Sequence, residues 1–565
     1  MYPHIRPFRF GIVVAFFLGL FALFFLRLVT IQLLRASFLS RLAAKQHTYY
    51  MELEPKRGAI YDCRRRPLAV NVATYSLYAV PPDVKDAEAV AARLKELLGL
   101  DPAFVRERLA RPKQFVWLAR KLEGPTMEKV EALKLDGLTF LKESRRSYPN
   151  ATLASHLLGF AGIDNVGLEG LELTYDAYLR GTPGWTYVLR DARQRPLTVT
   201  DVLQPPLDGY SLVLTIDEVI QFIAERELEK AYVKYKAKGA MIVVMDVATG
   251  AILASACRPT YDLNAPASAP LEARRHRVVT DFFEPGSAFK IVTASAALNE
   301  KAFSLEDKIF CENGTYRVAN HILHDVHEYG WLPFLKVIGY SSNIGTTKVA
   351  QKLGASKVYD YAAAFGFGKT THSGFHGEVG GILKPVSQWS KTSIGAVPIG
   401  QEVCVTTLQM VRAVAAIANG GVLMQPYVVK AIVDKRGEVI RAFAPKAVCR
   451  VMAEETAATV RTVLAWAVEE GTGRPARSKL FPFAGKTGTA QKIDPRGGYS
   501  HSLFMASFVG FAPVDNPKIA IAVVVDEPRP YYYGGVVSAP VFKAVAEDVL
   551  KYLGCAAVVT QEVNP

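Results

Sequence analysis

The sequence is poor in cysteine and lacks the motifs of several common functional classes. Its 565 residues contain only six cysteines, scattered from Cys63 to Cys555, which is too few and too dispersed for a disulfide scaffold. No His-Glu-x-x-His motif is present, and Gly366 and Gly368 lack the strand-to-helix setting of a nucleotide-binding loop. The net charge of +14 is spread along the chain without a long basic helix, which argues against a nucleic-acid-binding protein.

A long hydrophobic run occurs only once, near the N-terminus. Gly11–Leu26 carries no charged or polar side chain, and the apolar character continues to Leu34 with three interruptions. At 1.5 Å per residue this run reaches roughly 36 Å, enough to cross a bilayer core. We predict a short tail over 1–9 and one transmembrane helix over 10–34. A cleaved signal peptide is the alternative, but the run is long for one and no small-x-small site precedes Arg35.

The rest of the chain divides near residues 205–215, where Pro205-Pro206-Leu-Asp-Gly209 interrupts the regular patterns. Residues 35–210 contain mixed short strand and helix patterns and no obvious catalytic set. We interpret them as a strand-rich spacer and protein-interaction domain. A second domain over 211–555 and a tail over 556–565 complete the predicted organisation.

The second domain has strand patterns at both ends of its sequence and helical patterns between them. This order predicts an α+β fold in which helices cover an antiparallel sheet. The expected strands include 211–217, 240–246, 251–255, 506–511 and 519–525, and the expected helices include 219–236 and 539–553.

Three short motifs in this domain supply the parts of a serine acyl-transfer site. In Ser287-Ala-Phe-Lys290, the spacing of three places both side chains on one face of a helix. A lysine with a depressed pKa can remove the serine proton. Pro285-Gly286 suits the turn that opens such a helix, and the first helical turn offers unpaired N–H groups to an oxyanion. Taken alone, this spacing also occurs by chance in a chain of this length.

The other two motifs are Ser341-Ser-Asn343 and Lys486-Thr-Gly-Thr489. The first offers a hydroxyl that can relay a proton and an amide that can align a peptide. In the second, Lys486 supplies a positive charge for a substrate carboxylate and the threonine hydroxyls supply hydrogen bonds. The glycine suits a strand that a ligand backbone approaches closely. An ordinary loop and an ordinary edge strand are the alternatives for these segments.

A histidine-rich segment just before Ser341 offers a competing interpretation. His321, His324 and His327 lie close to acidic residues, and this composition could hold a metal. The spacing is not that of a zinc protease, so we favour a loop that lines a substrate cleft. His372 and His376 are separated by a Ser-Gly-Phe sequence that favours a loop over a helix.

With its motifs in this order, the chain resembles the penicillin-binding proteins, whose signature of Ser-x-x-Lys, Ser-Asp-Asn and Lys-Thr-Gly is shared with class A β-lactamases. The similarity is to the class B, monofunctional transpeptidases, and covers roughly residues 50–550. The Ser-Ser-Asn form and the short N-terminal module resemble the division (septal) branch more than the elongation branch. The similar segments are Pro55–Asp62, Leu168–Tyr175, Leu179–Gly184, Glu284–Lys290, Tyr340–Gly345, Gly471–Gly473 and Gly485–Gln491.

The resemblance implies a D,D-transpeptidase that cross-links peptidoglycan stem peptides through a serine acyl-enzyme. It implies a serine transpeptidase/β-lactamase-like fold for 211–555 and a pedestal, or dimerisation-like, domain for 35–210. The backbone N–H groups of Ser287 and Thr489 are the expected oxyanion hole. The implied catalytic residues are Ser287, Lys290, Ser341, Asn343 and Lys486, and the implied substrate-binding residues are Thr487, Gly488 and Thr489.

The resemblance also implies the protein's surroundings. It places a single-pass protein in the bacterial cytoplasmic (inner) membrane with its catalytic domain on the outer, periplasmic side, an orientation that charge counting leaves open. It implies β-lactams as inhibitors, and a polytopic glycan polymerase and the division complex as partners. It implies no cofactor, no metal and no nucleic acid.

Other functions use similar residues. A D,D-carboxypeptidase or β-lactamase-like hydrolase would pass the acyl group to water, and a non-catalytic β-lactam sensor or scaffold would use the fold for binding. Two positions depart from the family pattern: Cys63 stands where a basic residue is common, and Ala288 replaces the more usual threonine. The choice among division, elongation and sporulation stays open at this level.

Overall fold

The computed structural model describes residues 7–113, 115–190, 196–494 and 497–557. The chain forms two compact units. The first contains the segments up to residue 56, 73–143 and 181–208, and the second contains 57–72, 144–180 and the chain from 209 onward. Strand β3 (Pro67–Ala79) passes from the second unit into the first.

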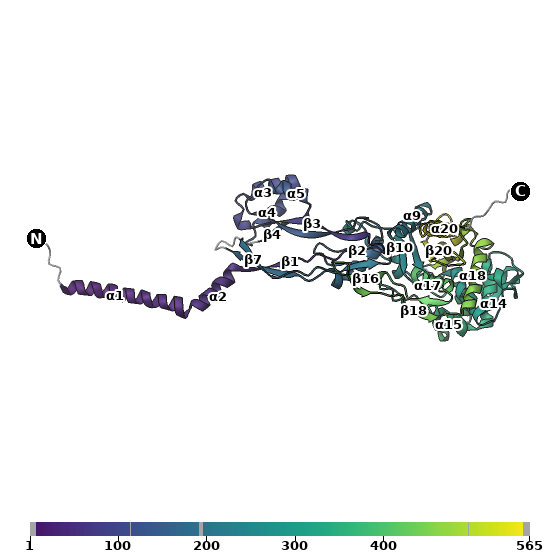
Figure 1. Cartoon of the computed structure of the whole chain (residues 1–565). Helices are drawn as coiled ribbons and strands as arrows, with labels where there is room; N and C mark the ends of the chain where they lie inside the picture. Colours follow the sequence, from purple (N-terminus) through teal and green to yellow (C-terminus); the bar gives the residue numbers. More distant parts are fainter. Residues whose placement is uncertain (1–6, 114, 191–195, 495–496, 558–565) are drawn as a thin grey trace. The chain divides into compact units, whose positions relative to one another are not determined.

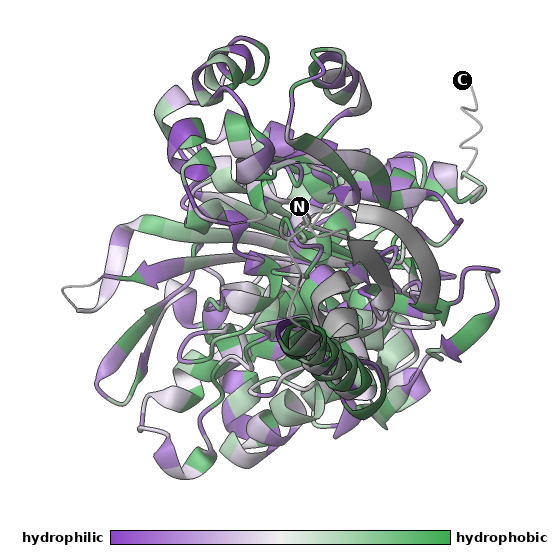
Figure 2. Ribbon diagram, turned by 90° about the vertical axis from the view of Figure 1, so that its left-hand side faces the viewer, coloured by the Kyte–Doolittle hydropathy of each residue, from purple (hydrophilic) through white to green (hydrophobic). Residues whose placement is uncertain are grey.

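The first unit begins with the expected apolar helix. Helix α1 (Pro7–Val29) continues through a π-helical turn (Thr30–Leu34) and is followed by α2 (Ala36–His47). Among the described residues, Phe8–Leu34 is the one helix long and apolar enough to cross a membrane. Its 27 residues span about 40 Å. Most of its large apolar side chains are exposed, and α1 is coloured almost entirely as hydrophobic (Figure 2).

The remainder of the first unit combines a small sheet with a small helical core. Strands β1 (Thr48–Leu53), β6 (Gly184–Arg190) and β7 (Pro196–Gln204) form a three-stranded antiparallel sheet. Helices α3 (Ala87–Leu98), α4 (Pro102–Leu109) and α5 (Gly124–Glu131) pack with the end of β3 and with β4 (Val116–Leu122). The Asp86 and Asp101 side chains accept hydrogen bonds from the first turns of α3 and α4 and so fix where these helices begin.

The second unit is built on a five-stranded antiparallel sheet of order β10-β9-β21-β20-β19. The strands are β9 (Gly239–Asp246), β10 (Ile252–Arg258), β19 (Ala484–Ile493), β20 (Tyr499–Ala512) and β21 (Ile519–Asp526). A second sheet joins β17 (Val439–Ala442), β16 (Val429–Val433), β8 (Ser211–Leu214), β2 (Ile60–Tyr61) and the beginning of β3.

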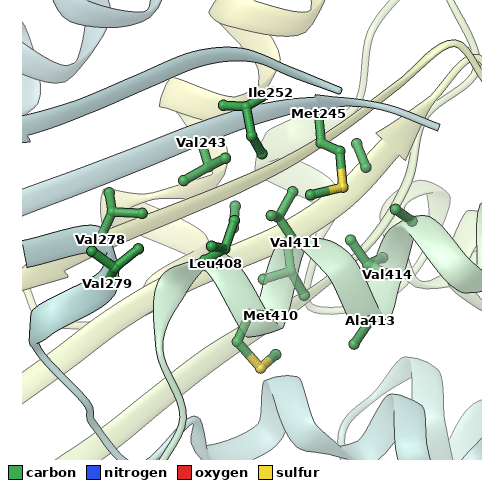
Figure 3. Packing of buried hydrophobic residues seen from close by; sticks show 14 of the residues in the cluster. Val243, Met245, Ile252, Val278, Val279, Leu408, Met410, Val411, Ala413 and Val414 are labelled. Carbon is green, nitrogen blue, oxygen red and sulfur yellow. The ribbon is translucent and has the colours of Figure 1, made fainter. Parts of the chain in front are cut away.

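Helices cover both faces of the five-stranded sheet because its central strands are apolar on both faces. In β9, Val243 and Met245 pack on one side with Leu408 and Val411 of α17 (Thr407–Ala418), as Figure 3 shows. The alternate residues pack on the other side with α9 (Glu218–Lys234) and α20 (Ala539–Tyr552), which lie together in Figure 1. This division follows from the two-residue period of a strand.

The longer helices between β10 and β19 carry or flank the first two motifs. Their bounds are α12 (Lys290–Asn299), α13 (Phe334–Gly339), α14 (Asn343–Leu353), α15 (Ala355–Ala364), α17 and α18 (Glu454–Glu469). The predicted α+β class is confirmed, as are the strands over 240–246 and 251–255 and the helices over 219–236 and 539–553, to within a few residues at each end. Strong hydrophobic periodicity made these elements predictable.

A buried ionic network ties together two segments of the second unit that are distant in sequence. The Arg57 guanidinium, fully buried, donates to Glu172 at 2.7 Å and to Asp176 at 2.6 Å. Arg146 donates to the other Glu172 oxygen at 2.6 Å, and Tyr148 donates to that same oxygen at 3.2 Å. Each charge therefore depends on its partners, since an unpaired buried ion is strongly destabilising.

Replacing Arg57 by methionine should destabilise this unit by about 3–5 kcal/mol, because Glu172 and Asp176 would both lose the buried guanidinium that they share. Thermal unfolding of the detergent-solubilised full chain measures the effect. The matched control is Arg477→Met, because Arg477 forms an ion pair with Glu469 that is about half exposed. An equal unfolding temperature for the two variants would contradict the assigned role of the network.

Candidate active site

The three motifs meet at the free edge of the five-stranded sheet. Ser287 lies in a 3₁₀ turn (Gly286–Phe289) that leads directly into α12, whose first residue is Lys290. The sequence predicted an α-helix here, and the structure corrects this to a 3₁₀ turn followed by an α-helix. A 3₁₀ turn still places residues i and i+3 on the same side, directly above one another. Ser287 is half-buried and Lys290 is fully buried.

Gly488 allows the edge strand β19 to lie against this turn. A Cβ at Gly488 would stand 2.2 Å from Ser507 Oγ and 2.6 Å from the carbonyl oxygen of Pro285. Gly286 has φ +54°, and a Cβ there would stand 2.8 Å from the carbonyl oxygen of Thr489. The sequence interpretation assigned the space at Gly488 to a ligand backbone, but the protein's own chain fills it. The glycine therefore sets the distance between the Ser287 turn and β19.

The second motif forms the turn between α13 and α14. Ser341 has φ +65°, a conformation that non-glycine residues adopt only when their surroundings hold them there. Ser342 caps α14 by accepting a hydrogen bond from the Gly345 N–H at 2.9 Å. This geometry directs Ser341 and the first helical residue, Asn343, toward Lys290.

Lys290 connects the first and second motifs. Its Nζ lies 2.6 Å from the Ser341 carbonyl oxygen, 3.2 Å from Ser341 Oγ and 2.8 Å from Asn343 Oδ1. Burial lowers the pKa of Lys290 to about 7, although the negative charge of Asp325 opposes this shift. A substantial fraction of Lys290 is therefore neutral near pH 7, as a general base requires. Within the described part of the chain, Ser287 Oγ forms no hydrogen bond and is free to meet a substrate.

Lys486 places a second buried amine beside the first. Burial, and then the charge of Lys290, hold the pKa of Lys486 well below its usual value. Its Nζ lies 3.3 Å from the Thr487 carbonyl oxygen and 3.5 Å from Thr487 Oγ1. Because two ammonium groups repel in this interior, an anionic ligand group would be favoured between them. Three residues of β19 offer groups that suit a carboxylate: the amine of Lys486 and the hydroxyls of Thr487 and Thr489.

The structure adds Asp325, which the sequence interpretation treated only as part of the histidine segment. Its carboxylate accepts hydrogen bonds from Ser342 Oγ at 2.5 Å, and from the N–H groups of Asn343 and, at 3.1 Å, Ile344. It thereby caps α14 and places a negative charge near Lys290. The aspartate lies 17 positions before the serine that it contacts, so no local capping pattern could have revealed it.

The histidine segment itself forms a hairpin and not a ligand cluster. Strand β13 (His321–His324) pairs with β12 (Thr315–Val318), and Asn343 Nδ2 donates to the His324 carbonyl oxygen at 2.9 Å. No group of three or more metal-ligating side chains occurs within the described ranges. The hairpin forms one wall beside the second motif.

Thr472, in the Gly471-Thr-Gly473 segment, links the second and third motifs. Its hydroxyl lies 2.8 Å from Thr487 Oγ1, and its N–H donates to the Gly339 carbonyl oxygen at 3.2 Å. A Cβ at Gly471 would stand 2.3 Å from that same carbonyl oxygen. The segment was noted in the sequence without a role, and the structure places it as a support for both motifs.

Comparisons with known proteins agree with this arrangement. Residues 240–547 match the family described as "Penicillin binding protein transpeptidase domain", and residues 52–214 match "Penicillin-binding Protein dimerisation domain". The chain is 35% identical over 556 residues to "Probable peptidoglycan D,D-transpeptidase PenA" of Neisseria gonorrhoeae, covering 97% of this chain and 93% of that protein. It is 34% identical to "Stage V sporulation protein D" of Bacillus subtilis, covering 93% of this chain and 82% of that protein.

A solved structure is similar over most of the chain. Penicillin-binding protein 3 of Mycobacterium tuberculosis, complexed with ampicillin, is 28% identical and superimposes with a TM-score of 0.72. The match covers 91% of this chain and 98% of that one.

The site predicts a pH profile for acylation of the full-length protein by fluorescent penicillin. The rate constant should rise about tenfold per pH unit below pH 7 and level off above it, because only the neutral amine of Lys290 accepts a proton. Asp325→Asn should move the inflection to lower pH, because the aspartate charge favours the charged form of Lys290. It should also lower the plateau roughly tenfold, since Asn343 would be held less firmly.

Asp307→Asn is the matched control. Asp307 accepts a hydrogen bond from the Ser304 N–H at 2.8 Å in an exposed turn of the same unit. The Asp307→Asn variant should keep the pH profile of the unmodified protein. An Asp325→Asn profile with an unchanged inflection would show that this carboxylate does not act on Lys290.

Proposed function

The chain belongs to the class B penicillin-binding proteins, the monofunctional peptidoglycan D,D-transpeptidases, and we propose that Ser287 is the nucleophile that carries its acyl transfer. The observation that supports this most directly is the buried amine of Lys290. It is three residues from Ser287, has a pKa lowered to about 7, and touches both Ser341 and Asn343. This combination provides a base for a serine without a histidine or a metal.

In the first step, neutral Lys290 takes the proton of Ser287 as Oγ attacks the penultimate D-Ala carbonyl of a stem peptide. The N–H groups of Ser287 and Thr489 stabilise the oxyanion. Support for Thr489 comes from the position of β19 at the sheet edge, where alternate N–H groups have no strand partner. As the carbon–nitrogen bond breaks, the Lys290 proton passes through the Ser341 hydroxyl to the departing D-Ala amine.

In the second step, an amino group of a neighbouring stem peptide attacks the ester carbonyl. Lys290 accepts a proton from this amine, and the serine oxygen leaves and is reprotonated. The product is a 4→3 cross-link. Asn343 positions the donor amide, and Lys486, Thr487 and Thr489 hold the terminal carboxylate before it departs, with Gly488 keeping β19 close to the nucleophile. The base, the proton relay and the groups that position the substrate are all residues of this chain.

A β-lactam mimics the D-Ala-D-Ala end and would remain as an ester on Ser287. Hydrolysis of the acyl-enzyme by water would make the protein a carboxypeptidase or β-lactamase, and a protein that acylates without turnover would be a sensor. The proposal of transpeptidation is supported by the family of the chain. The products distinguish the transpeptidase, the hydrolase and the sensor. A transpeptidase gives mainly cross-linked product, a hydrolase gives mainly hydrolysed product, and a sensor gives neither.

We further propose that α1 anchors the protein in the cytoplasmic membrane, with 1–9 inside and 211–555 outside as the transpeptidase domain. Residues 35–210 then serve as the pedestal and 556–565 as a tail. A septal role, with a polytopic glycan polymerase and the division complex as partners, is supported by the Ser341-Ser-Asn343 form and the short N-terminal module.

Ser287→Ala should abolish labelling by fluorescent penicillin, with a loss of at least about a thousandfold, because no other hydroxyl occupies the position of the nucleophile. Gel fluorescence of the purified full chain measures this loss. Ser304→Ala, at an exposed turn of the same unit, is the matched control and should label normally. If Ser287→Ala is labelled as fast as the unmodified protein, Ser287 is not the nucleophile.

Depletion of the protein in its own cells tests the septal role. Filamentous cells are expected, because blocked septal cross-linking stops division while side-wall growth continues. Microscopy with a plasmid-borne copy as the control gives the result. Round cells would contradict a septal role, and normal division with failed sporulation would place the protein in spore formation.

A further inference from the structure

Two of the six cysteines line the same cavity of the second unit. The cavity has a volume of about 380 Å³, and its walls include Cys63, Cys555 and Asp217. Cys63 is one of the two positions that depart from the family pattern, and the proposed mechanism gives neither cysteine a role. The fold therefore brings together two thiols that lie near opposite ends of the sequence.

The backbone fixes both cysteines at this cavity. The Cys63 N–H donates to the Ile216 carbonyl oxygen at 2.8 Å, and the Cys63 thiol donates to Asp217 Oδ2 at 3.6 Å. Cys555 lies just beyond the end of α20, where its N–H donates to the Leu550 carbonyl oxygen at 3.0 Å. This is the hydrogen bond with which a Schellman motif ends a helix. Each thiol thus has a defined place beside the cavity.

Asp217 connects the two segments that carry these thiols. The Tyr552 hydroxyl, three residues before Cys555, donates to the Asp217 carboxylate and lies 3.0 Å from each of its oxygens. Arg64, next to Cys63, forms an ion pair with Asp217 at 3.1 Å and stands over the Tyr552 ring at 4.7 Å. One carboxylate and one aromatic ring therefore hold the Cys63 segment against the end of α20.

The exposure of the thiols favours oxidation of this pair. Cys257 and Cys311 are fully buried in the core, whereas Cys63 and Cys555 are half-buried at the cavity. Disulfides form and persist in the oxidising compartments outside the cytoplasm. The same cavity offers no metal site, because no group of three or more metal-ligating side chains occurs within the described ranges.

The surroundings of Cys63 set the order in which the two thiols react. Burial, and then the negative charge of Asp217, raise the pKa of Cys63 to about 11. Cys63 is therefore a poor first nucleophile near pH 7, because the thiolate is the attacking form. Once Cys555 carries a disulfide, the attack of Cys63 is intramolecular, and its high effective concentration offsets its small thiolate fraction.

We propose that Cys63 and Cys555 are a redox-active pair that an external disulfide oxidant joins by a disulfide bond. The Cys555 thiolate attacks one sulfur of the oxidant's disulfide and releases the first thiol of the oxidant. Cys63 then gives its proton to Asp217 and attacks the Cys555 sulfur, which releases the second thiol. The two cysteines lose two electrons and two protons in all, and the disulfide of the oxidant gains them.

The bond fastens the end of α20 to the segment that leads into β3. A disulfide holds its two Cα atoms within about 7 Å of one another, so its formation closes the cavity. Because the bond joins residues far apart in the sequence, it restricts the unfolded chain and stabilises the folded unit. This inference goes beyond the proposed function of Ser287 and does not depend on it.

Oxidation of the full-length, detergent-solubilised protein tests the pair. The protein is reduced, freed of reductant and incubated with oxidised glutathione, and the remaining thiols are blocked with N-ethylmaleimide. Mass spectrometry of the digested protein should find the peptide of Cys63 linked to that of Cys555 in most molecules. The unfolding temperature of the oxidised protein should be about 5 °C above that of the reduced protein.

Three serine variants identify the source of these effects. Cys63→Ser and Cys555→Ser should each lose the linked peptide and the rise in unfolding temperature. Cys449→Ser is the matched control and should keep both, because Cys449 is an exposed thiol of the same unit on β18 (Ala447–Arg450). Labelling of each reduced variant by fluorescent penicillin checks that the substitution leaves the unit folded.

The peptide map of the unmodified protein decides the proposal even where a serine variant does not fold. Glutathione attached singly to Cys63 and Cys555, with no linked peptide, would overturn the pair. A link from either residue to a different cysteine, or no oxidation of either, would also overturn it. Because the map does not use the activity of Ser287, a failure of the proposed nucleophile would leave this result unchanged.

Discussion

The close contact between β19 and the Ser287 turn is the constraint on which the site depends. Gly488 and Gly286 remove two side chains from this contact, and a Cβ at either position would overlap the opposing backbone. The contact holds Lys290 and Lys486 together in an interior where neither amine reaches water. Desolvation then lowers both pKa values, so the chemistry of the base follows from the packing of two backbone segments.

Charges around the cleft divide into two groups. The buried amines of Lys290 and Lys486 form a group of nitrogen donors that an approaching carboxylate would favour in the charged form, while Asp325 holds the second motif and raises the pKa of Lys290 against the effect of burial. Glu284 and Glu402 form a negative group on the side toward Tyr499.

Much of the fold was predictable because its elements have strong hydrophobic patterns. β9 and β21 are apolar on both faces, and the helices over 218–234 and 539–552 carry periodic apolar residues. The 3₁₀ turn at Ser287 was not predictable, because α and 3₁₀ turns share the same short-range sequence preferences. The close contact at Gly488 was not predictable, since a sequence shows that a side chain is absent but not what fills the space. Asp325 was missed because it lies 17 positions before Ser342 in the sequence, too far for a local capping pattern to show the contact.

The sequence by itself determined the chemistry of the site and its family. The spacing of Ser287 and Lys290, the order of the three motifs and the apolar N-terminal helix are local properties that need no fold to be recognised. Only the tertiary structure decided how acidic Lys290 is, which carboxylate supports Asn343 and which two of the six cysteines line one cavity. These properties depend on burial and on contacts between residues far apart in the chain, because the energy of a charge is set by its surroundings in three dimensions.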